Sequence, residues 1–175
     1  LMAQIRELVC LLPANNEDEA FDEECEDELN RVCADLENAA GDPAIVLSNI
    51  SDDAVFFETK KDYAKEMVTG FIKLNGATVG AVANRTALYD EEGNKAEEFA
   101  AELTARGCLK AAEFVNFCDA FNIPVLTLTN VNGFKATMCS ERNIAAAAAK
   151  LTYAFGNATV PKVNVIVGKA FGNAY

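Results

Sequence analysis

Two runs of β-branched and small apolar residues, 67–74 and 77–84, flank the pair Asn75-Gly76. An Asn-Gly pair between two such runs predicts a two-residue type I′ turn, because that turn needs a positive φ at both positions. We therefore expect a β-hairpin over 67–84.

Beyond the hairpin, the apolar pattern switches between helix and strand periods. An apolar stripe within 112–118 predicts a helix of about three turns that ends at Asn122. The runs 125–131 and 163–167 are rich in Val, Leu and Ile and are predicted to be buried strands. The segment 140–159 between them is predicted to be helical, with Ser140 as its cap. A strand, a crossover helix and a second strand indicate an α/β fold with parallel strands.

The first 66 residues differ from the rest in their pattern of apolar and acidic residues. Apolar residues at helical spacing predict a helix over 1–12, which Pro13 ends, and a second, charged helix is predicted over 27–39. The segment 15–26 is dense in acid and is expected to be an exposed loop, because carboxylates that repel one another gain nothing from burial. We interpret 1–66 as a helical, acidic linking segment and 67–175 as the main α/β unit.

Composition and charge limit the classes of function. The chain has 175 residues, 51% of them apolar, which is ample for a packed core. No apolar run approaches the ~18 residues that span a bilayer, so we expect no membrane segment and a cytoplasmic protein. The net charge of −12 and the absence of a basic stripe disfavour nucleic-acid binding.

The cysteine pattern and the lack of histidine further limit the kinds of metal site and catalytic group that the chain can form. Six cysteines occur without a CxxC pair, and the chain has no His, so a zinc site is not expected. The cysteines are predicted to be reduced thiols in a reducing compartment. Neither Ser-His-Asp nor Cys-His catalysis can be built from this chain alone.

Each of the two later strands is followed by a segment that contains glycine, 131–137 and 168–175. Ligands bind at the carboxyl ends of parallel strands, and backbone N–H groups approach an anion closely where no Cβ intervenes. The pattern therefore allows an anion-binding concavity at this edge of the sheet. It equally allows that these glycines serve only packing.

Three stretches carry a family resemblance: VTGFIKLNGATVGAVAN (68–84), KAAEFVNFCDAFNIPVLTLTNVNGF (110–134) and AKLTYAFGNATVPKVNVIVGKAFGNAY (149–175). They resemble the carboxyltransferase subunit of biotin-dependent acyl-CoA carboxylases and decarboxylases, such as propionyl-CoA carboxylase β chains. The resemblance implies a partial crotonase-like fold. In that interpretation 1–66 holds the tail of the first half of the subunit, and 67–175 holds the front of the second. It also implies that these 175 residues are inactive by themselves.

The same resemblance implies a reaction and its partners. A carboxyl group would move between biotin and the α-carbon of an acyl-CoA of the propionyl or methylmalonyl type. Biotin would arrive on a biotin carboxyl carrier protein, and biotin carboxylase or membrane decarboxylase subunits would be further partners. The full-length subunit would form a homo-oligomer, a hexamer as is usual in the family.

The resemblance also implies which residues form the site. The backbone N–H groups of Asn173 and Ala174 would stabilise the negative charge, and Gly172 and Tyr175 would complete that turn. Gly133 and Phe134 would line the same cleft.

Two departures from the family pattern leave alternatives open. Asn173 replaces a second glycine of the turn, and Thr137 stands where a glycine is usual. The chain could therefore belong to an assembly module that has lost turnover of biotin. A crotonase-fold hydratase or isomerase would need a positioned acid, and Glu141 is the only acid near Gly133 in the sequence.

Overall fold

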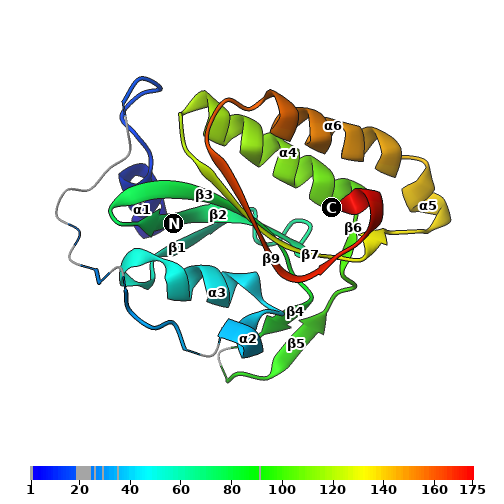
Figure 1. The fold of residues 1–175 in the computed structure, drawn as a ribbon, viewed down its shortest axis with the longest axis horizontal. Helices are drawn as coiled ribbons and strands as arrows, with labels where there is room; N and C mark the ends of the chain where they lie inside the picture. Colours follow the sequence, from blue (N-terminus) through cyan, green and yellow to red (C-terminus); the bar gives the residue numbers. More distant parts are fainter. Residues whose placement is uncertain (1, 19–24, 26, 29, 35, 91) are drawn as a thin grey trace.

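The computed structural model describes residues 2–175 apart from 19–24, 26, 29, 35 and 91 (Figure 1). Its centre is a five-stranded sheet in the order β1-β2-β3-β7-β9. The bounds are β1 Phe56–Thr59, β2 Met67–Leu74, β3 Ala77–Asn84, β7 Val125–Val131 and β9 Lys162–Ala170. The first three strands pair antiparallel, whereas β3 with β7 and β7 with β9 pair parallel.

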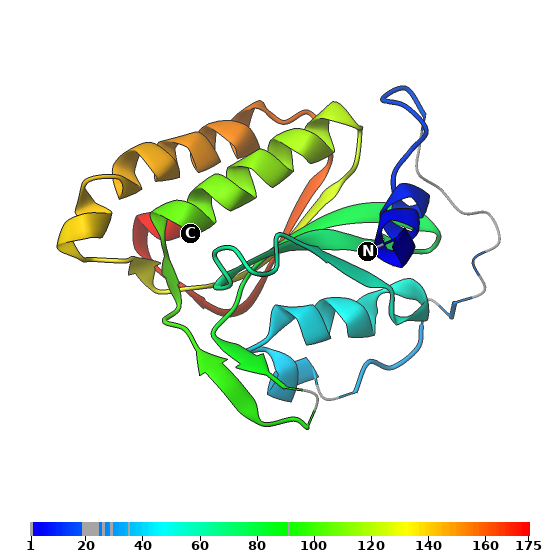
Figure 2. The ribbon, with the colours of Figure 1, turned by 180° about the vertical axis from the view of Figure 1, so that it is seen from behind.

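Helices cover both faces of this sheet. Helices α4 (Ala105–Ala120) and α6 (Ile144–Asn157) lie over one face, and α3 (Pro43–Ile50) lies over the other (Figures 1 and 2). Side chains alternate accordingly along β2, because Phe71 joins the core under α4 while Val68 and Ile72 join the core over α3. The fold is thus a three-layer α/β/α arrangement.

The predicted hairpin is confirmed. Strands β2 and β3 are joined by Asn75 and Gly76 alone, with φ of 51° and 80°. The Asp52 carboxylate accepts hydrogen bonds from both turn amides, at 3.0 Å from Asn75 N and 2.7 Å from Gly76 N. Asp52 belongs to the short 3₁₀ turn η1 (Asp52–Ala54), so this turn holds the hairpin tip in place.

The predicted strands, helices and parallel crossover of the later part are confirmed, with three corrections. Ser140 is not a cap, because Thr137 caps the short helix α5 (Met138–Glu141) and accepts the Ser140 N–H at 3.2 Å. Strand β9 is not buried: within the described sheet it is the edge strand, and the side chain of Val163 is 58% exposed. Helix α4 has 16 residues, more than the three turns expected, and it ends at Ala120 rather than at Asn122; Thr104 caps its start.

In the first part of the chain, one predicted helix is confirmed and one is wrong. Helix α1 (Met2–Leu11) ends before Pro13 as expected, but among the described residues of 27–39 only α2 (Leu36–Ala39) is helical. The reason is Arg31, whose guanidinium pairs with Asp27 and donates to the carbonyls of Asn49 and Ser51, both at 2.7 Å. These contacts tie the segment to the end of α3 and override its helical propensity.

Helix α3 was not anticipated, although it carries a local start signal. The Asp42 carboxylate accepts the Ala44 N–H at 3.1 Å as an N-cap, and Pro43 occupies the first helical turn. In the acidic loop 15–26, the described residues 15–18 are exposed as expected, whereas Cys25 is half-buried and donates to the Asp52 carboxylate at 3.4 Å; the other residues lie outside the described part of the chain.

Residues before 67 also contribute to the sheet, since β1 pairs with β2 and α3 packs on the same strands. The domain boundary at residue 66 stays a prediction. Two small sheets complete the fold: β4 (Ala87–Tyr89) with β5 (Lys95–Glu98), and β6 (Glu102–Leu103) with β8 (Gly133–Phe134). None of the described helices is long and apolar enough to cross a membrane.

Arg85, just after β3, is a buried cation between two carboxylates. Its side chain lies 2.9 Å from Asp42 and 3.0 Å from Glu58, and both Arg85 and Asp42 are almost wholly buried. Burial alone would lower the pKa of Arg85, but the hydrogen bond and charge of Glu58, together with Asp42, raise it overall. The cluster therefore joins the start of α3, strand β1 and the end of β3.

We expect Gly76→Val to lower the free energy of unfolding by about 1–2 kcal/mol, because a β-branched residue resists a positive φ. Urea denaturation followed by circular dichroism measures the change. Asn75→Gly is the matched control, since glycine accepts the turn conformation, and it should shift the free energy by less than about 0.5 kcal/mol. An unchanged midpoint for Gly76→Val would contradict the turn.

We expect Arg85→Met to lower the free energy of unfolding by about 3–5 kcal/mol, because it leaves the buried Asp42 carboxylate without its cation. The exposed Arg142 offers a control, and Arg142→Met should change stability by no more than about 0.5 kcal/mol. Equal urea midpoints for the two variants would show that the buried cluster does not stabilise the fold.

Candidate functional site at the carboxyl edge of the parallel strands

The parallel pairing of β7 with β9 brings two distant segments to one edge of the sheet. The pairs run in register from Val125 with Lys162 to Thr129 with Ile166. At the far end the Phe171 N–H donates to the Val131 carbonyl at 3.1 Å. The segments that come after β7 and β9 therefore start side by side, as the sequence predicted.

After β7 the chain is held by the short strand β6 rather than left as a free loop. The Asn132 N–H donates to the Ala101 carbonyl at 2.6 Å, and the Lys135 N–H donates to Leu103 at 2.9 Å. These bonds flank Gly133 and Phe134, which form β8. Because β6 leads directly into α4, the position of Phe134 is fixed relative to that helix.

After β9 the chain makes one 3₁₀ turn, η2 (Gly172–Ala174). Gly172 has a φ of +63°, a conformation that side chains with a Cβ resist. A Cβ at Gly172 would meet no atom within 4 Å, so the backbone conformation, and not lack of space, calls for glycine here.

A cavity of about 560 Å³ lies between the sheet and helices α4 and α6. Four of the predicted site residues line it: Phe134, Asn173, Ala174 and Tyr175. Gly133 and Gly172 are not among its lining residues, and each lies next to one that is. The structure thus brings the η2 turn and the β8 segment together on one cavity.

The sheet side of the cavity, its floor, carries polar side chains among apolar ones, and the sequence did not predict these polar residues. Thr127 and Thr129 of β7, Asn164 of β9 and Asn84 at the end of β3 all line it. The Thr129 hydroxyl and the Asn164 side-chain oxygen lie 2.7 Å apart, so the hydroxyl donates to that oxygen. The strand period of two gives a signal for Thr127 and Thr129, because alternate residues of a strand share a face.

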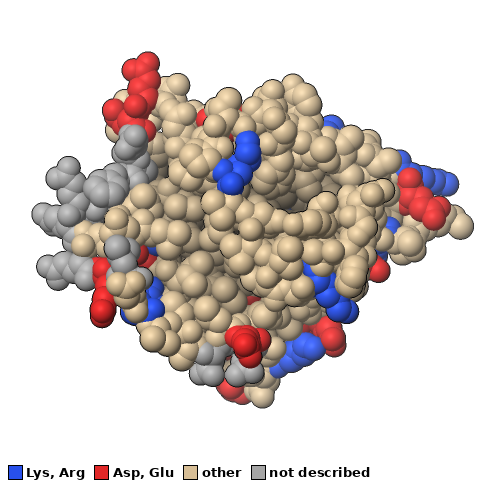
Figure 3. Space-filling view, in the orientation of Figure 1, with Lys and Arg blue, Asp and Glu red and all other residues tan. Residues whose placement is uncertain are grey.

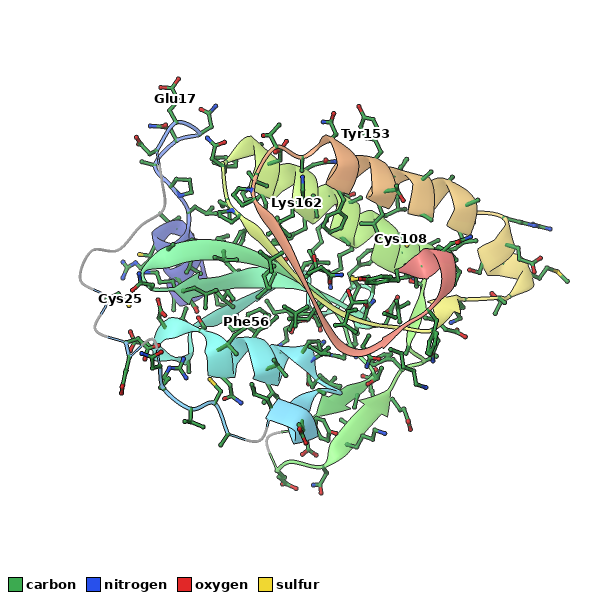
Figure 4. All side chains as sticks on the ribbon, in the orientation of Figure 1. Glu17, Cys25, Phe56, Cys108, Tyr153 and Lys162 are labelled. Atoms are coloured by element: carbon green, nitrogen blue, oxygen red, sulfur yellow. The ribbon has the colours of Figure 1, made fainter. Side chains whose placement is uncertain are left out.

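The opposite wall is apolar and comes from helix α6 and from the strand β6 that precedes α4. Leu151, Phe155 and Leu103 line it. Lys162, at the start of β9, also lines the cavity and donates to the Ala158 carbonyl (Figure 4). Among the described lining residues none is Asp or Glu, so the cavity offers hydroxyls, amides and one ammonium rather than a carboxylate base.

The surface around β9 carries few charges. In the view of Figure 3, acidic and basic side chains lie mainly toward the rim of the molecule, and the central part is uncharged apart from a basic group above its centre. A ligand that is partly apolar therefore meets no concentrated charge on this face.

The buried thiols are not nucleophiles. Burial raises the pKa of Cys108 to about 11 and that of Cys118 to about 12, so both are protonated at neutral pH. Cys108 lies on α4 within the core (Figure 4). In the described part of the chain, no three Cys, Asp or Glu side chains come together as a metal site would require.

Comparison with known proteins places this geometry in a family. A family model for the carboxyl transferase domain matches residues 1–175. The chain is 42% identical to the propionyl-CoA carboxylase beta chain of Cereibacter sphaeroides, over 98% of this chain and 33% of that protein. It is 36% identical to the methylmalonyl-CoA decarboxylase subunit alpha of Propionigenium modestum, again over 98% and 33%. The chain thus spans about a third of the length of these relatives.

Solved structures agree with the fold. The hexameric transcarboxylase 12S with methylmalonyl-coenzyme A and methylmalonic acid bound superposes with a TM-score of 0.78 at 36% identity. That match covers 99% of this chain and 33% of the transcarboxylase chain. A geranyl-CoA carboxylase beta subunit from P. aeruginosa gives a TM-score of 0.67 at 26% identity, over 98% of this chain and 32% of that one. The expected crotonase-like α/β fold is confirmed.

Proposed function

Since this chain belongs to the carboxyl transferase domain family, we propose that it is part of an enzyme that moves a carboxyl group between biotin and an acyl-CoA. Its relatives named as propionyl-CoA carboxylase and methylmalonyl-CoA decarboxylase subunits favour an acyl-CoA of the propionyl or methylmalonyl type. The observation that carries the proposal is the meeting of η2 with Phe134 on a single cavity.

The chemistry requires stabilisation of negative charge. During the transfer, negative charge must be stabilised on the thioester oxygen of the acyl-CoA enolate or on the ureido oxygen of biotin. Backbone N–H groups aimed at such an oxygen lower the barrier, and no histidine is needed for this task. We assign this role to the N–H groups of Asn173 and Ala174, which belong to residues that line the cavity, and the oxygen that they would hold is the ureido oxygen of biotin.

The cavity residues fit both reactants. Hydroxyl and amide groups of Thr129, Asn164 and Asn84 can hold a polar ring or a carboxylate, and Leu151 and Phe155 can pack against an apolar acyl chain. Biotin, when bound, supplies or accepts the carboxyl group. The side chains of this chain then bind the reactants, orient them and exclude water.

The partners and the cellular location are inferred from the same family. We propose that biotin arrives on a carrier protein, that biotin carboxylase or membrane decarboxylase subunits complete the complex, and that the subunits form a hexamer. Transcarboxylase 12S, to which this chain is similar, is such a hexamer. All six cysteines are free thiols, which favours a reducing compartment such as the cytoplasm.

The residues of the cavity do not fit a hydratase or isomerase. A hydratase or isomerase would need an acid at the cavity, but Glu141 lies on the exposed helix α5 and does not line it. An assembly module without turnover remains the second candidate, because Asn173 adds a side chain to the turn.

A carboxyl-transfer assay distinguishes the enzyme from the assembly module. The protein that carries this chain is incubated with methylmalonyl-CoA labelled in its carboxyl group and with free biotin; transfer of the label to biotin and formation of unlabelled propionyl-CoA are followed. We expect propionyl-CoA to form faster with biotin than without it. A stable, folded protein that gives no biotin-dependent propionyl-CoA would support the assembly module instead.

Two glycines with the same backbone requirement test the role of η2. Gly172 and Gly93 both have a positive φ, and a Cβ at either would meet no atom within 4 Å. We expect Gly172→Val and Gly93→Val to lower stability by a similar amount, about 1–2 kcal/mol. Only Gly172→Val should lower kcat, by roughly tenfold or more, because it displaces the turn that lines the cavity.

Gly93 lies in the hairpin between β4 and β5 and serves as the control. Equal kcat values for the two variants would show that η2 has no role in the reaction. Thermal unfolding of both proteins shows whether the matched loss of stability is achieved.

A further inference from the structure

The β7–β9 ladder has an irregularity just before the cavity. Pairing is regular as far as Thr129 with Ile166, and the next pair is Val131 with Ala170. Asn130 therefore stands alone opposite the segment 167–169. Such a bulge bends the longer strand and redirects the segment after it, and here that segment is η2.

The Asn130 side chain accepts a hydrogen bond from a backbone N–H group in the bulge, outside the regular pairing of the two strands. The Lys169 N–H donates to Asn130 Oδ1 at 3.0 Å. On the other side, the Asn130 N–H lies 3.5 Å from the side-chain oxygen of Asn84, which lines the cavity floor. Asn130 thus links the floor of the cavity with the bulge that precedes η2.

Gly168 leaves the space that the Asn130 amide occupies. A Cβ built on Gly168 would lie 2.5 Å from Asn130 Oδ1 and 2.7 Å from its Cγ. Atoms cannot approach so closely, and the short Asn130 side chain would have to move away. Gly168 therefore leaves room for the Asn130 side chain, and that side chain accepts a hydrogen bond from the backbone of the next residue, Lys169.

We propose that Asn130 is a positioning residue, which fixes the bulge of β9 so that the η2 turn is held against the cavity. Asn130 is not among the residues that line the cavity, so it acts through Lys169 and Phe171, the latter bonded to Val131. The effect on the reaction rests on the proposed function, whereas the effect on the backbone of β9 does not.

Amide hydrogen exchange tests the backbone effect without any assay of activity. In the protein that carries this chain, Asn130→Ala should make the Lys169 amide exchange about tenfold faster or more, because its acceptor is gone. Asn130→Asp keeps an oxygen acceptor and should retain most of the protection. The Val125 amide, which donates to Pro161 at the other end of the pair, should not change.

A double-mutant cycle tests the coupling to turnover. We expect Asn130→Ala and Gly168→Ala each to lower kcat by about tenfold, with a smaller change in KM, because a displaced turn weakens contacts made in the transition state. The double variant should lose no more than either single one, since truncation of Asn130 leaves room for the methyl group that Gly168→Ala adds. Asn130→Asp should recover most of the turnover.

Asn94, on the exposed β4–β5 hairpin, provides the matched control, and Asn94→Ala should leave kcat and Lys169 exchange unchanged. Unchanged Lys169 exchange in Asn130→Ala would overturn the positioning role. Additive losses in the cycle, or no rescue by Asn130→Asp, would overturn it as well. If the unmodified protein transfers no carboxyl group, the proposed function fails, and the exchange comparison alone decides the role of Asn130.

Discussion

The parallel pairing of β7 with β9 is the constraint on which the candidate site depends. Two parallel strands joined by a crossover helix must end at the same edge of the sheet, because such a crossover returns the chain to its starting side. Helix α6 is that crossover, and it also supplies most of the apolar wall of the cavity. One topological feature therefore sets both the position of η2 beside β8 and the space between them.

The surrounding elements serve to hold this edge in place. Strand β6 fixes Phe134 through two backbone hydrogen bonds and leads into α4. On the other side of the sheet, the buried Arg85 joins β1, β3 and the cap of α3, directly after Asn84 of the cavity floor. The site is thus built from short segments whose backbones are already bonded to the sheet or to its neighbours, which suits a reaction that depends on backbone donors.

The sequence predicted those parts of the fold that local patterns determine. Asn75-Gly76 defines its own turn, and the Val- and Leu-rich run of β7 has the bounds expected for it. The helix predicted over 27–39 failed because Arg31 finds acceptors on Asn49 and Ser51, which are distant in sequence. Similarly, β9 has the composition of a core strand, but its burial depends on neighbours that no local pattern contains.

The candidate site likewise contains residues that the sequence predicted and residues that it did not. Phe134, Asn173, Ala174 and Tyr175 were predicted through the family resemblance, and the structure places all four on one cavity. The polar residues of the floor were missed, because Thr127, Thr129 and Asn164 become neighbours only through the register of β7 with β9. The role that we propose for Asn130 could not have been foreseen from spacing either, since it depends on a bulge in the partner strand.

A crystal structure of the protein that carries this chain, with methylmalonyl-CoA and biotin present, tests the central claim most directly. We expect ligand density in the cavity bordered by Phe134 and η2, with a ligand oxygen within about 2.7–3.1 Å of the Asn173 or Ala174 backbone nitrogen. Ligand density at another surface, or β8 and η2 at opposite edges of the sheet, would contradict it.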